Sequence, residues 1–437
     1  MISLERYIHA AANATLHQPS GVVVEVVGLL VEVGGLKAGV GDILQIAGGG
    51  LDLEVIGFRA GRLVATPLGS VAGVRPGTRV IRLDRGTNIG VGDALLGRIV
   101  DSFGRPLDEK PPPDLATRAP VRAPPPPPVS RRPIDKVFST GVRAIDALLT
   151  LGCGQRVGIF AGAGVGKSTL LGMICRSSTA DVNVIGLVGE RGREVNDFVR
   201  GTLGDDGLAR SVVVAATSDQ PPLVRARGAE AATAIAEYFR DQGKSVLLVM
   251  DSVTRYAMAQ REAALATGEP PATKGYPPSV FAALPRLLER AGTAAGEGTI
   301  TALYTVLVEG DELSDPVADA ARSILDGHIV LSRSLAERGH FPAIDVLQSV
   351  SRLAPNLMAP PQTRAATMLR DLLATRQEAM DLVRVGAYVA GSDPRVDAAL
   401  RMAPHIDTLL RQNVDERTPM DHTLKAMIHL AAQSGIA

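Results

Sequence analysis

Short hydrophobic runs separated by glycine-containing turns dominate the chain between Gly21 and about Arg98. The runs are Val22–Val27, Leu29–Val33, Ile43–Ile46, Leu53–Phe58, Leu63–Pro67 and Thr78–Arg82. Their length and spacing predict short strands that close into a small β-barrel. We therefore assign residues 20–100 to a β-barrel domain.

A different pattern extends from about Pro133 to Leu353, where nearly continuous apolar runs alternate with helical stretches. The runs are Arg156–Phe160, Val182–Val188, Ser211–Ala216, Ser245–Met250, Ile300–Val308 and Gly327–Leu331. Continuous apolar strands separated by helices are typical of a parallel sheet that is buried on both faces. Residues 134–353 are therefore predicted to form an α/β domain. From there to the end, residues 354–437 read as a helical domain, with Thr363–Ala379, Pro394–Leu410 and Met420–Gln433 as its helices.

Two further stretches lie outside these domains. Apolar or small residues at three- and four-residue spacing predict an amphipathic helix within residues 1–19, over residues 2–17. A helix that packs on its own domain and one that docks a partner fit this pattern equally well. Residues 101–133 are rich in proline and include the run Pro124–Pro128. Because proline fixes φ, we expect an extended, semi-rigid linker here rather than a ligand for a recognition domain.

The composition restricts the classes of function. Lys and Arg (46) balance Asp and Glu (46), so no net field attracts nucleic acid or an anionic membrane. Aromatic residues make up 3% of the chain and Trp is absent, which argues against single-stranded nucleic acid bound by base stacking. Phe58 is the one aromatic residue of the predicted barrel, whose charges are mixed in sign. We therefore interpret the barrel as an assembly module and expect no nucleic-acid partner.

The cysteines and the apolar runs point to a cytoplasmic protein. Cys153 and Cys175 are too few for a disulfide framework or a zinc site of their own. No run of about 18 apolar residues could span a membrane, and the N-terminus lacks the features of a secretory signal. Any membrane role is expected to be peripheral.

The most informative motif is Ala161-Gly-Ala-Gly-Val-Gly-Lys-Ser168, directly after the predicted strand Arg156–Phe160 and before a helical pattern. This is the context of a phosphate-binding loop, in which backbone N–H groups and a helix N-terminus cradle phosphates. Lys167 is expected to reach the β- and γ-phosphates of a nucleotide, and Ser168 to ligate Mg²⁺. Ala161 stands where the first glycine is usual. The predicted nucleotide-binding residues are Gly162, Ala163, Gly164, Val165, Gly166, Lys167, Ser168 and Thr169.

Acidic residues follow two other predicted strands. Ser245–Met250 runs into Asp251, and Val182–Val188 is followed by Gly189, Glu190 and Arg191. Because chemistry collects at the carboxyl ends of parallel strands, we expect Asp251 to hold the Mg²⁺ shell. Glu190 is placed to orient the water that attacks ATP, and Arg191 to steady phosphate charge. A solvated charged turn at Glu190 and Arg191 is the alternative.

Long motifs resemble a known family. Gly189-Glu-Arg-Gly-Arg-Glu-Val195 is similar to the rotary and secretion ATPases, relatives of the ATP synthase catalytic subunit. Three further stretches, Asp251–Arg261, Gly275–Arg290 and Asp315–Arg333, resemble the export ATPase of the flagellum and of type III secretion systems. The resemblance covers about residues 20–437. It implies an N-terminal β-barrel, a RecA-like phosphate-loop core, a helical C-terminal domain and a ring of six identical subunits.

The resemblance also implies roles for individual residues. Lys167 and Ser168 bind phosphate and Mg²⁺, Glu190 is the catalytic carboxylate and Asp251 is the acid of the second nucleotide motif. Arg352, in Gln348-Ser-Val-Ser-Arg352, matches the arginine finger that reaches the nucleotide of a neighbouring subunit. Phe341 matches the aromatic residue that stacks on adenine, where many relatives carry Tyr.

The implied function is Mg²⁺-dependent ATP hydrolysis that energises protein export, with substrate unfolding and release from chaperones. The implied partners are a stator-like regulator at residues 2–17, a central stalk protein, export substrates and chaperones at the C-terminal helices, and an export gate at the inner face of the membrane. Thr254–Arg261 and Pro67–Gly77 look more flagellar than injectisome-like.

Other classes of protein remain open at this stage. An injectisome export ATPase is the first alternative. An RNA translocase of the transcription-terminator type shares the barrel and the core, but needs an aromatic, basic barrel. A rotary synthase subunit would assemble with a non-catalytic partner, whereas this chain holds both Glu190 and Arg352. A nucleotide-binding scaffold without catalysis is motivated by Ala161 alone.

Overall fold

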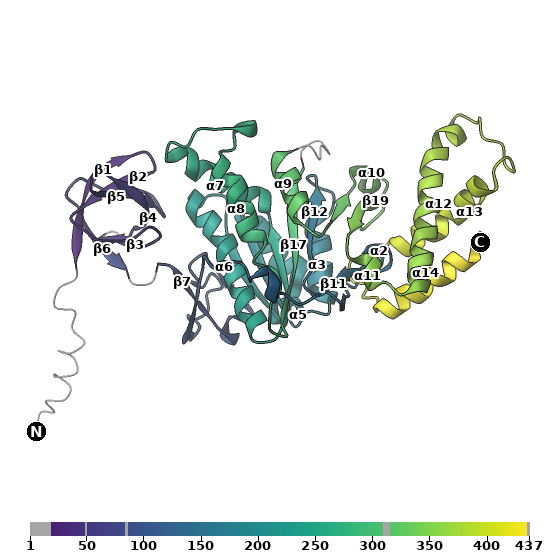
Figure 1. Ribbon diagram of the computed structural model, residues 1–437, viewed down its shortest axis with the longest axis horizontal. Helices are drawn as coiled ribbons and strands as arrows, with labels where there is room; N and C mark the ends of the chain where they lie inside the picture. Colours follow the sequence, from purple (N-terminus) through teal and green to yellow (C-terminus); the bar gives the residue numbers. More distant parts are fainter. Residues whose placement is uncertain (1–18, 49, 84–85, 309–314, 435–437) are drawn as a thin grey trace, which may run out of the picture. The chain divides into compact units, whose positions relative to one another are not determined.

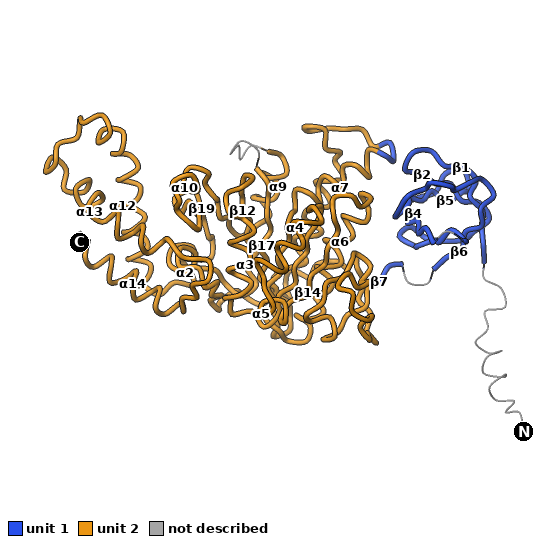
Figure 2. The backbone as a smooth tube through the Cα atoms, turned by 180° about the vertical axis from the view of Figure 1, so that it is seen from behind, with its two compact units in different colours: residues 1–88, 266–268 blue, residues 89–265, 269–437 orange. Residues whose placement is uncertain are grey.

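The computed structural model describes residues 19–48, 50–83, 86–308 and 315–434. The helix predicted over residues 2–17 lies outside them. The described chain divides into two compact units, one that ends at Asn88 and also holds residues 266–268, and one that holds the rest (Figure 2).

The first unit is a closed six-stranded barrel with the strand order β1-β2-β5-β4-β3-β6 (Figure 1). Its strands are β1 (Ser20–Val27), β2 (Leu30–Gly34), β3 (Ile43–Ile46), β4 (Asp52–Arg59), β5 (Arg62–Pro67) and β6 (Arg79–Leu83). Alternate side chains enter the barrel, so Val31 and Val33 of β2 are buried while Glu32 between them forms an ion pair with Arg62. Each of the six runs predicted from the sequence forms one of these strands.

The second unit is built on a nine-stranded, mainly parallel sheet, with the order β19-β18-β12-β17-β15-β13-β14-β8 and β16 paired to β17. The strands are β8 (Arg98–Val100), β12 (Arg156–Ala161), β13 (Val182–Val188), β14 (Ser211–Ala216), β15 (Ser245–Asp251), β16 (Gly292–Thr293), β17 (Thr299–Leu307), β18 (Gly327–Leu331) and β19 (Ile344–Ser351). All neighbours from β18 to β8 run parallel, and β19 and β16 pair antiparallel. The parallel sheet inferred from the apolar runs is thus confirmed.

Strand β8 lies within residues 20–100, the stretch assigned to the barrel from the sequence. It nevertheless pairs with β14 in the central sheet, and the first compact unit already ends at Asn88. A strand of three residues carries too little hydrophobic pattern to reveal which sheet it joins.

Helices cover both faces of the sheet and create two cores. Leu247 and Val249 of β15 enter the same core as α3, whereas Val246 and Leu248 enter the core that contains α6, α7, α8 and α9. The helices of this unit before the C-terminal domain are α2 (Arg143–Leu148), α3 (Lys167–Ser177), α4 (Gly192–Asn196), α5 (Gly204–Ala209), α6 (Pro222–Asp241), α7 (Val253–Ala266), α8 (Pro278–Leu288), α9 (Pro316–Ile324) and α10 (Arg333–Glu337). Burial on both faces explains why the strands read as continuous apolar runs.

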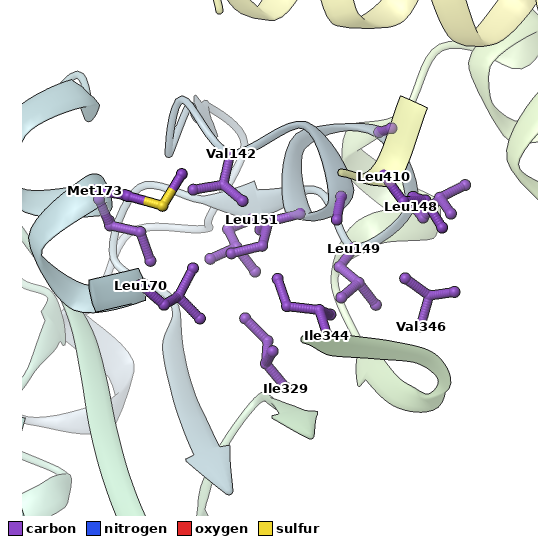
Figure 3. Close-up of a cluster of buried hydrophobic side chains, with 14 of the residues drawn as sticks. Val142, Leu148, Leu149, Leu151, Leu170, Met173, Ile329, Ile344, Val346 and Leu410 are labelled. Atoms are coloured by element: carbon purple, nitrogen blue, oxygen red, sulfur yellow. The ribbon is translucent and has the colours of Figure 1, made fainter. Parts of the chain in front are cut away.

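The C-terminal helices are α11 (Ala354–Leu357), α12 (Pro360–Arg384), α13 (Pro394–Leu410) and α14 (Met420–Gln433). They pack on α2 and β19, and Figure 3 shows Leu410 beside Leu148 of α2, within a core that Ile344 and Val346 of β19 also enter. The helical domain expected here is confirmed, and the structure extends the first predicted helix to Arg384.

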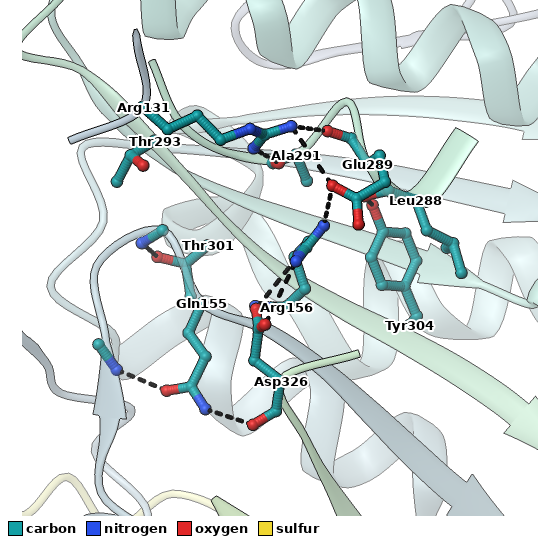
Figure 4. Close-up of polar contacts among 12 residues, drawn as sticks. Arg131, Gln155, Arg156, Leu288, Glu289, Ala291, Thr293, Thr301, Tyr304 and Asp326 are labelled. Carbon is teal, nitrogen blue, oxygen red and sulfur yellow. Dashed lines mark hydrogen bonds and ion pairs between the residues drawn. The ribbon is translucent and has the colours of Figure 1, made fainter. Parts of the chain in front are cut away.

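The proline-rich linker is tied to the second unit both before and after its proline run Pro124–Pro128. Its strand β9 (Thr117–Pro120) pairs with β7 (Asn88–Val91), and Val121 is buried. Beyond the proline run, Arg131 donates to the carbonyl oxygens of Glu289 and Ala291 (Figure 4). Arg156, the first residue of β12, bridges the same Glu289 to Asp326. These contacts hold the linker at the amino-terminal edge of the sheet.

The remaining short elements are β10 (Val137–Phe138), β11 (Leu151–Gly152), a π-helical segment (Asp197–Leu203) and the 3₁₀ turns Asp93–Leu95, Pro128–Ser130 and Thr273–Gly275. Among the residues that the structure describes, no helix is long and apolar enough to cross a membrane.

Candidate functional site

The glycine-rich loop connects the carboxyl end of β12 to the first turn of α3. Gly164 and Gly166 have φ values of 77° and 90°, in the left-handed region that side chains disfavour. Ala161 is the last residue of β12, is buried and pairs with both β17 and β18. Its methyl group therefore belongs to the strand and leaves the loop itself unchanged, so the loop keeps the form that wraps a phosphate.

Lys167, the first residue of α3, points back to the ends of two other strands. Its Nζ donates to Asp251 Oδ1 at the end of β15 and lies 3.8 Å from Glu190 Oε1, just beyond β13. The structure thus brings together Lys167, Glu190 and Asp251, three residues that the sequence predicted to meet at the carboxyl edge of the sheet.

Asp251 is buried, with 3% of the residue exposed. Its Oδ1 also accepts a hydrogen bond of 2.7 Å from Thr305 Oγ1 on β17, the strand between β12 and β15. A buried carboxylate needs such partners, because an isolated charge away from water is costly. Lys167 and Thr305 together hold this side chain in one position.

Glu190 has a pKa raised to about 7. Burial is the largest cause; Lys167 lowers the pKa, whereas Asp251 and a hydrogen bond with Glu194 raise it. The same hydrogen bond lowers the pKa of Glu194. A carboxylate that titrates near neutral pH is suited to accept a proton from an attacking water.

Arg191 is oriented differently. Its side chain is 80% exposed and lies 3.6 Å from Glu194, its ion-pair partner. The structure therefore places Arg191 at the rim of the site, where solvent competes for its charge, and not in contact with Lys167 or Asp251.

Ser168 and Thr169 occupy the first turn of α3, and Ser168 is exposed. Mg²⁺ is commonly held by one or two protein oxygens together with substrate phosphates. The Ser168 hydroxyl, next to the Lys167–Asp251 contact, and the Asp251 carboxylate fit that set of ligands. Among the described residues no group of three His, Cys, Asp or Glu side chains could hold a metal alone. A metal here would depend on the nucleotide for its other ligands.

Phe341 lies beside the loop. A Cβ atom built on Gly166 would be 3.6 Å from Cδ1 and Cε1 of the Phe341 ring. The carbonyl oxygen of Phe341 accepts a hydrogen bond of 3.0 Å from the N–H of Gln412, beyond α13. The residue is 45% exposed, so part of its ring surface is available for stacking.

Arg352 lies at the opposite edge of the sheet. It follows β19, and its N–H donates to the carbonyl oxygen of Asp326, which precedes β18 and pairs with Arg156 at the start of β12. The loop follows the other end of β12, and at about 3.3 Å per residue a strand of six residues separates the two by roughly 20 Å. Within one chain the structure does not bring Arg352 to Lys167, Glu190 and Asp251.

Comparison with known proteins agrees with this geometry. Residues 141–351 match the model of the ATP synthase alpha/beta family nucleotide-binding domain, and residues 358–429 match that of the T3SS EscN ATPase C-terminal domain. The flagellum-specific ATP synthase of Salmonella typhimurium is 54% identical, over 86% of this chain and 84% of that protein. The type 3 secretion system ATPase of Xanthomonas euvesicatoria is 50% identical, over 93% of each.

A solved structure, the assembled ATPase EscN in complex with its central stalk EscO from enteropathogenic E. coli, superposes with a TM-score of 0.89. It is 45% identical and covers 94% of this chain and 100% of that one. The chain belongs to the ATP synthase alpha/beta family.

Within this family the chain is a protein-export ATPase, as the motifs from Glu190 to Arg333 implied. The predictions of an enzyme and of a phosphate-loop core between a barrel and a helical domain are confirmed. An RNA translocase is not favoured by these comparisons.

Two residues of this export ATPase's site were not found from the sequence. Thr305 lies inside the apolar run Ile300–Val308, and the available signal was a polar residue near the carboxyl end of a buried strand. Glu194 lies four residues beyond Glu190 within a charged turn, where no pattern distinguishes it from its neighbours.

Proposed function

We propose that this chain hydrolyses Mg²⁺-bound ATP as one of six identical subunits in a ring, and that the ring energises flagellar protein export. The main support for the proposal is that Lys167 contacts Glu190 and Asp251 at the carboxyl edge of the sheet, whereas Arg352 lies at the opposite edge. A ring places one edge of each subunit against the next, so the two half-sites would meet between subunits.

Each residue has a proposed role in this reaction. The N–H groups from Gly162 to Thr169 bind the phosphates, and Lys167 exchanges its bonds to the two carboxylates for the β- and γ-phosphates. Glu190 orients the attacking water and accepts its proton. Phe341 stacks on the adenine, with Gln412 fixing its backbone.

Ser168 and Asp251 would hold Mg²⁺, which would supply positive charge beside the phosphates of the nucleotide. Thr305 keeps the Asp251 carboxylate in position. Arg352 of one subunit stabilises the γ-phosphate bound by its neighbour, and Arg191 adds weaker, solvent-screened charge at the rim.

The first test measures ATPase activity against protein concentration, with and without RNA, for the wild type, Glu190→Gln and Arg352→Ala. Specific activity is expected to rise with concentration, because assembly completes the site, and to ignore RNA. Loss of the general base lowers turnover by roughly 100-fold or more. Loss of an arginine finger lowers it by roughly 1,000-fold. Arg395→Ala, which removes an exposed ion pair with Asp371, is the matched control.

Mixing the two inactive variants gives a sharper result. In random mixed rings, about one interface in four pairs an intact Glu190 with an intact Arg352 from its neighbour. Activity should therefore reappear in the mixture but in neither variant alone. If Arg352→Ala retains turnover, or if the mixture stays inactive while each variant still assembles, Arg352 is not a finger in trans.

The proposal extends to partners. EscN is solved with a central stalk, EscO, and we propose that a stalk protein contacts the loop between α12 and α13 here. That loop exposes Val385 (76%) and Val389 (69%), and Leu382 of α12 is also exposed, so several apolar side chains here are available to a partner. Export substrates and their chaperones are proposed to bind the C-terminal helices. A stator-like regulator is proposed to bind residues 2–17.

The flagellar system is proposed over the injectisome from Thr254–Arg261 and Pro67–Gly77. We further propose that the protein is cytoplasmic and works peripherally at the inner face of the membrane, next to an export gate. We propose five parts of the chain: an N-terminal helix (1–19), the barrel (20–100), the proline-rich linker (101–133), the ATPase domain (134–353) and the helical domain (354–437). Strand β8, although within residues 20–100, belongs to the sheet of the ATPase domain.

A further inference from the structure

A cavity of about 800 Å³ lies between the sheet and the C-terminal helices of the second unit. Residues of α10, β19 and the turn between them line one side, and residues of α12 and α13 line the other. Neither Phe341 nor any residue from Gly162 to Thr169 contributes to its wall. The cavity therefore excludes the phosphate loop and Phe341, although Ser332 and Gln348 in its wall also line a smaller pocket beside Gly162. Its volume lies in the range of small-molecule sites, about 300–1,000 Å³.

Most charges in the wall are already matched. Arg376 pairs with Asp407 at 3.3 Å, and Arg384 pairs with Asp381 at 3.6 Å. The carboxylate of Asp345 accepts hydrogen bonds from its own turn, including the N–H groups of Leu347 and Gln348 at 3.0 Å each. Because these charged groups already have partners within the chain, they are poorly suited to bind a ligand.

Arg338 and Arg411 are the exceptions. Within the described part of the chain, neither forms an ion pair with a carboxylate. Arg338 donates from Nε to the carbonyl oxygen of Ser334 at 2.9 Å, and Arg411 donates from Nε to Nδ1 of His340 at 3.4 Å. Two guanidinium groups that lack a carboxylate partner therefore line the cavity, Arg338 from the end of α10 and Arg411 from the end of α13.

His340 also lines the cavity and accepts the hydrogen bond from Arg411. It is buried, and its pKa is lowered by burial and by Arg411, Arg338 and Arg376, with Asp407 opposing them. The imidazole is therefore neutral near pH 7, which lets Nδ1 accept the hydrogen bond from Arg411. A neutral histidine adds no charge that would repel or bind an anion by itself, so the unpaired positive charge that lines the cavity comes from the two arginines.

The floor of the cavity is apolar. Ile344, Val346 and Leu410 line it and belong to the same core as Leu148 and Leu149 of α2 (Figure 3). An apolar floor beside two guanidinium groups matches a molecule with a hydrophobic body and an anionic head, because a guanidinium binds carboxylate or phosphate through a fork of N–H donors.

We propose that this cavity is a second ligand site, distinct from the nucleotide site. Its ligand is a small organic anion whose carboxylate or phosphate is bound by Arg338 and Arg411, and whose apolar part rests on Ile344, Val346 and Leu410. The proposal does not depend on the ring or on the role of Arg352.

The test uses the full chain with saturating Mg²⁺-ADP, so that the phosphate loop is filled. Two probes, 4-(4-fluorophenyl)butyrate and 4-fluorophenyl phosphate, are titrated and their binding is followed by ¹⁹F NMR. We expect saturable binding of at least one probe that ADP does not displace. The double variant Arg338→Gln/Arg411→Gln should weaken it at least 10-fold, whereas Arg395→Gln, outside the cavity, should bind like the wild type. Binding of the phosphate probe alone would identify a phosphorylated ligand, and binding of the carboxylate probe a carboxylic acid.

Unchanged ADP affinity and circular dichroism verify that the double variant is folded. Three results would overturn the proposal: no saturable binding of either probe, displacement of the probe by ADP, or equal binding by the folded double variant.

Discussion

At the scale of single residues, the site depends on how three charged side chains share one small volume. Lys167 lies within ion-pair distance of both Glu190 and Asp251, and Asp251 also accepts a hydrogen bond from the Thr305 hydroxyl. Asp251 is thereby fixed in position, whereas Glu190 is buried next to another carboxylate and its pKa is raised to about 7.

The raised pKa of Glu190, about 7, leads to a pH prediction. In the proposed reaction the deprotonated carboxylate of Glu190 accepts the proton from water, so kcat/KM should rise with pH and level off above pH 7. Below that pH it should fall about tenfold per unit, as for a single required base. The measurement is the pH profile of kcat/KM for the wild type. A profile that is flat from pH 5.5 to 8 would exclude Glu190 as the base in the free enzyme.

Thr305 gives a second prediction at this scale. Thr305→Val keeps the shape of the side chain but removes the hydrogen bond of 2.7 Å to Asp251, whose loss costs about 1–3 kcal/mol for a charged acceptor. We expect kcat to fall roughly 10-fold, in line with about 1.4 kcal/mol per tenfold. Thr305→Ser, which restores the hydroxyl, should recover most of the activity. Equal activity of the valine and serine variants would show that this hydrogen bond does not support the site.

The sequence predicted this site unevenly, for physical reasons. Glu190 and Asp251 could be placed beside Lys167 because parallel strands carry their carboxyl ends to one edge. Thr305 could not, since its role depends on which strand lies between β12 and β15, an order that the chain does not reveal. Arg352 was predicted from the family resemblance alone, because no local pattern marks a residue whose proposed action is on a neighbouring subunit.

At the scale of elements, long buried strands were predicted and short or half-exposed ones were missed. β13 and β14 are buried along their whole length and coincide with their predicted runs. β19 alternates buried and partly exposed positions, including Asp345 and Gln348, and was not recognised. An edge strand with one covered face lacks the continuous apolar signal of a central strand.

The turn that precedes α2 supports a third prediction. Asp146 is buried and accepts hydrogen bonds from the N–H and hydroxyl of Thr140 at 2.8 and 2.7 Å, from Ser139 Oγ at 2.8 Å and from the N–H of Gly141 at 3.1 Å. Because α2 carries the C-terminal helices, Asp146→Ala should lower the free energy of unfolding of the second unit. Each unsatisfied buried donor costs about 1–3 kcal/mol; the two hydroxyls can rotate to other acceptors, so the two N–H groups dominate and a loss of about 2–6 kcal/mol is expected.

Denaturant unfolding measures this loss, and Asp421→Ala on α14, where the side chain is 62% exposed, is the control. The control should change the free energy by no more than about 0.5 kcal/mol. If both variants unfold alike, the buried carboxylate does not hold the turn.

At the scale of the whole molecule, the functional surfaces lie on different parts of one chain. The phosphate loop and Arg352 are at opposite edges of the central sheet, and the exposed valines of the α12–α13 loop lie on neither edge but in the helical domain. Catalysis and stalk binding should therefore be separable by mutation. The sequence could be divided into these parts because the spacing of hydrophobic residues differs between the barrel, the central sheet and the helical domain. The exposure of loop residues such as Val385 could not be predicted, because it depends on how the helices pack.

The double variant Val385→Asp/Val389→Asp tests that separation. Both valines are mostly exposed, so aspartate there adds charge to solvent and should leave the fold and the basal ATPase activity within about twofold of the wild type. A stalk protein that covers these valines would have to bury two carboxylates, which costs several kcal/mol, so its affinity should fall by at least 100-fold. Calorimetric titration with the cognate stalk protein measures this affinity.

The control is Val129→Asp, at a fully exposed valine in the proline-rich linker. It adds negative charge elsewhere and should bind the stalk protein normally. If the double variant binds the stalk protein as tightly as this control, the α12–α13 loop is not the stalk-binding surface. If the control also loses affinity, added negative charge anywhere weakens binding and the loop is not a specific contact.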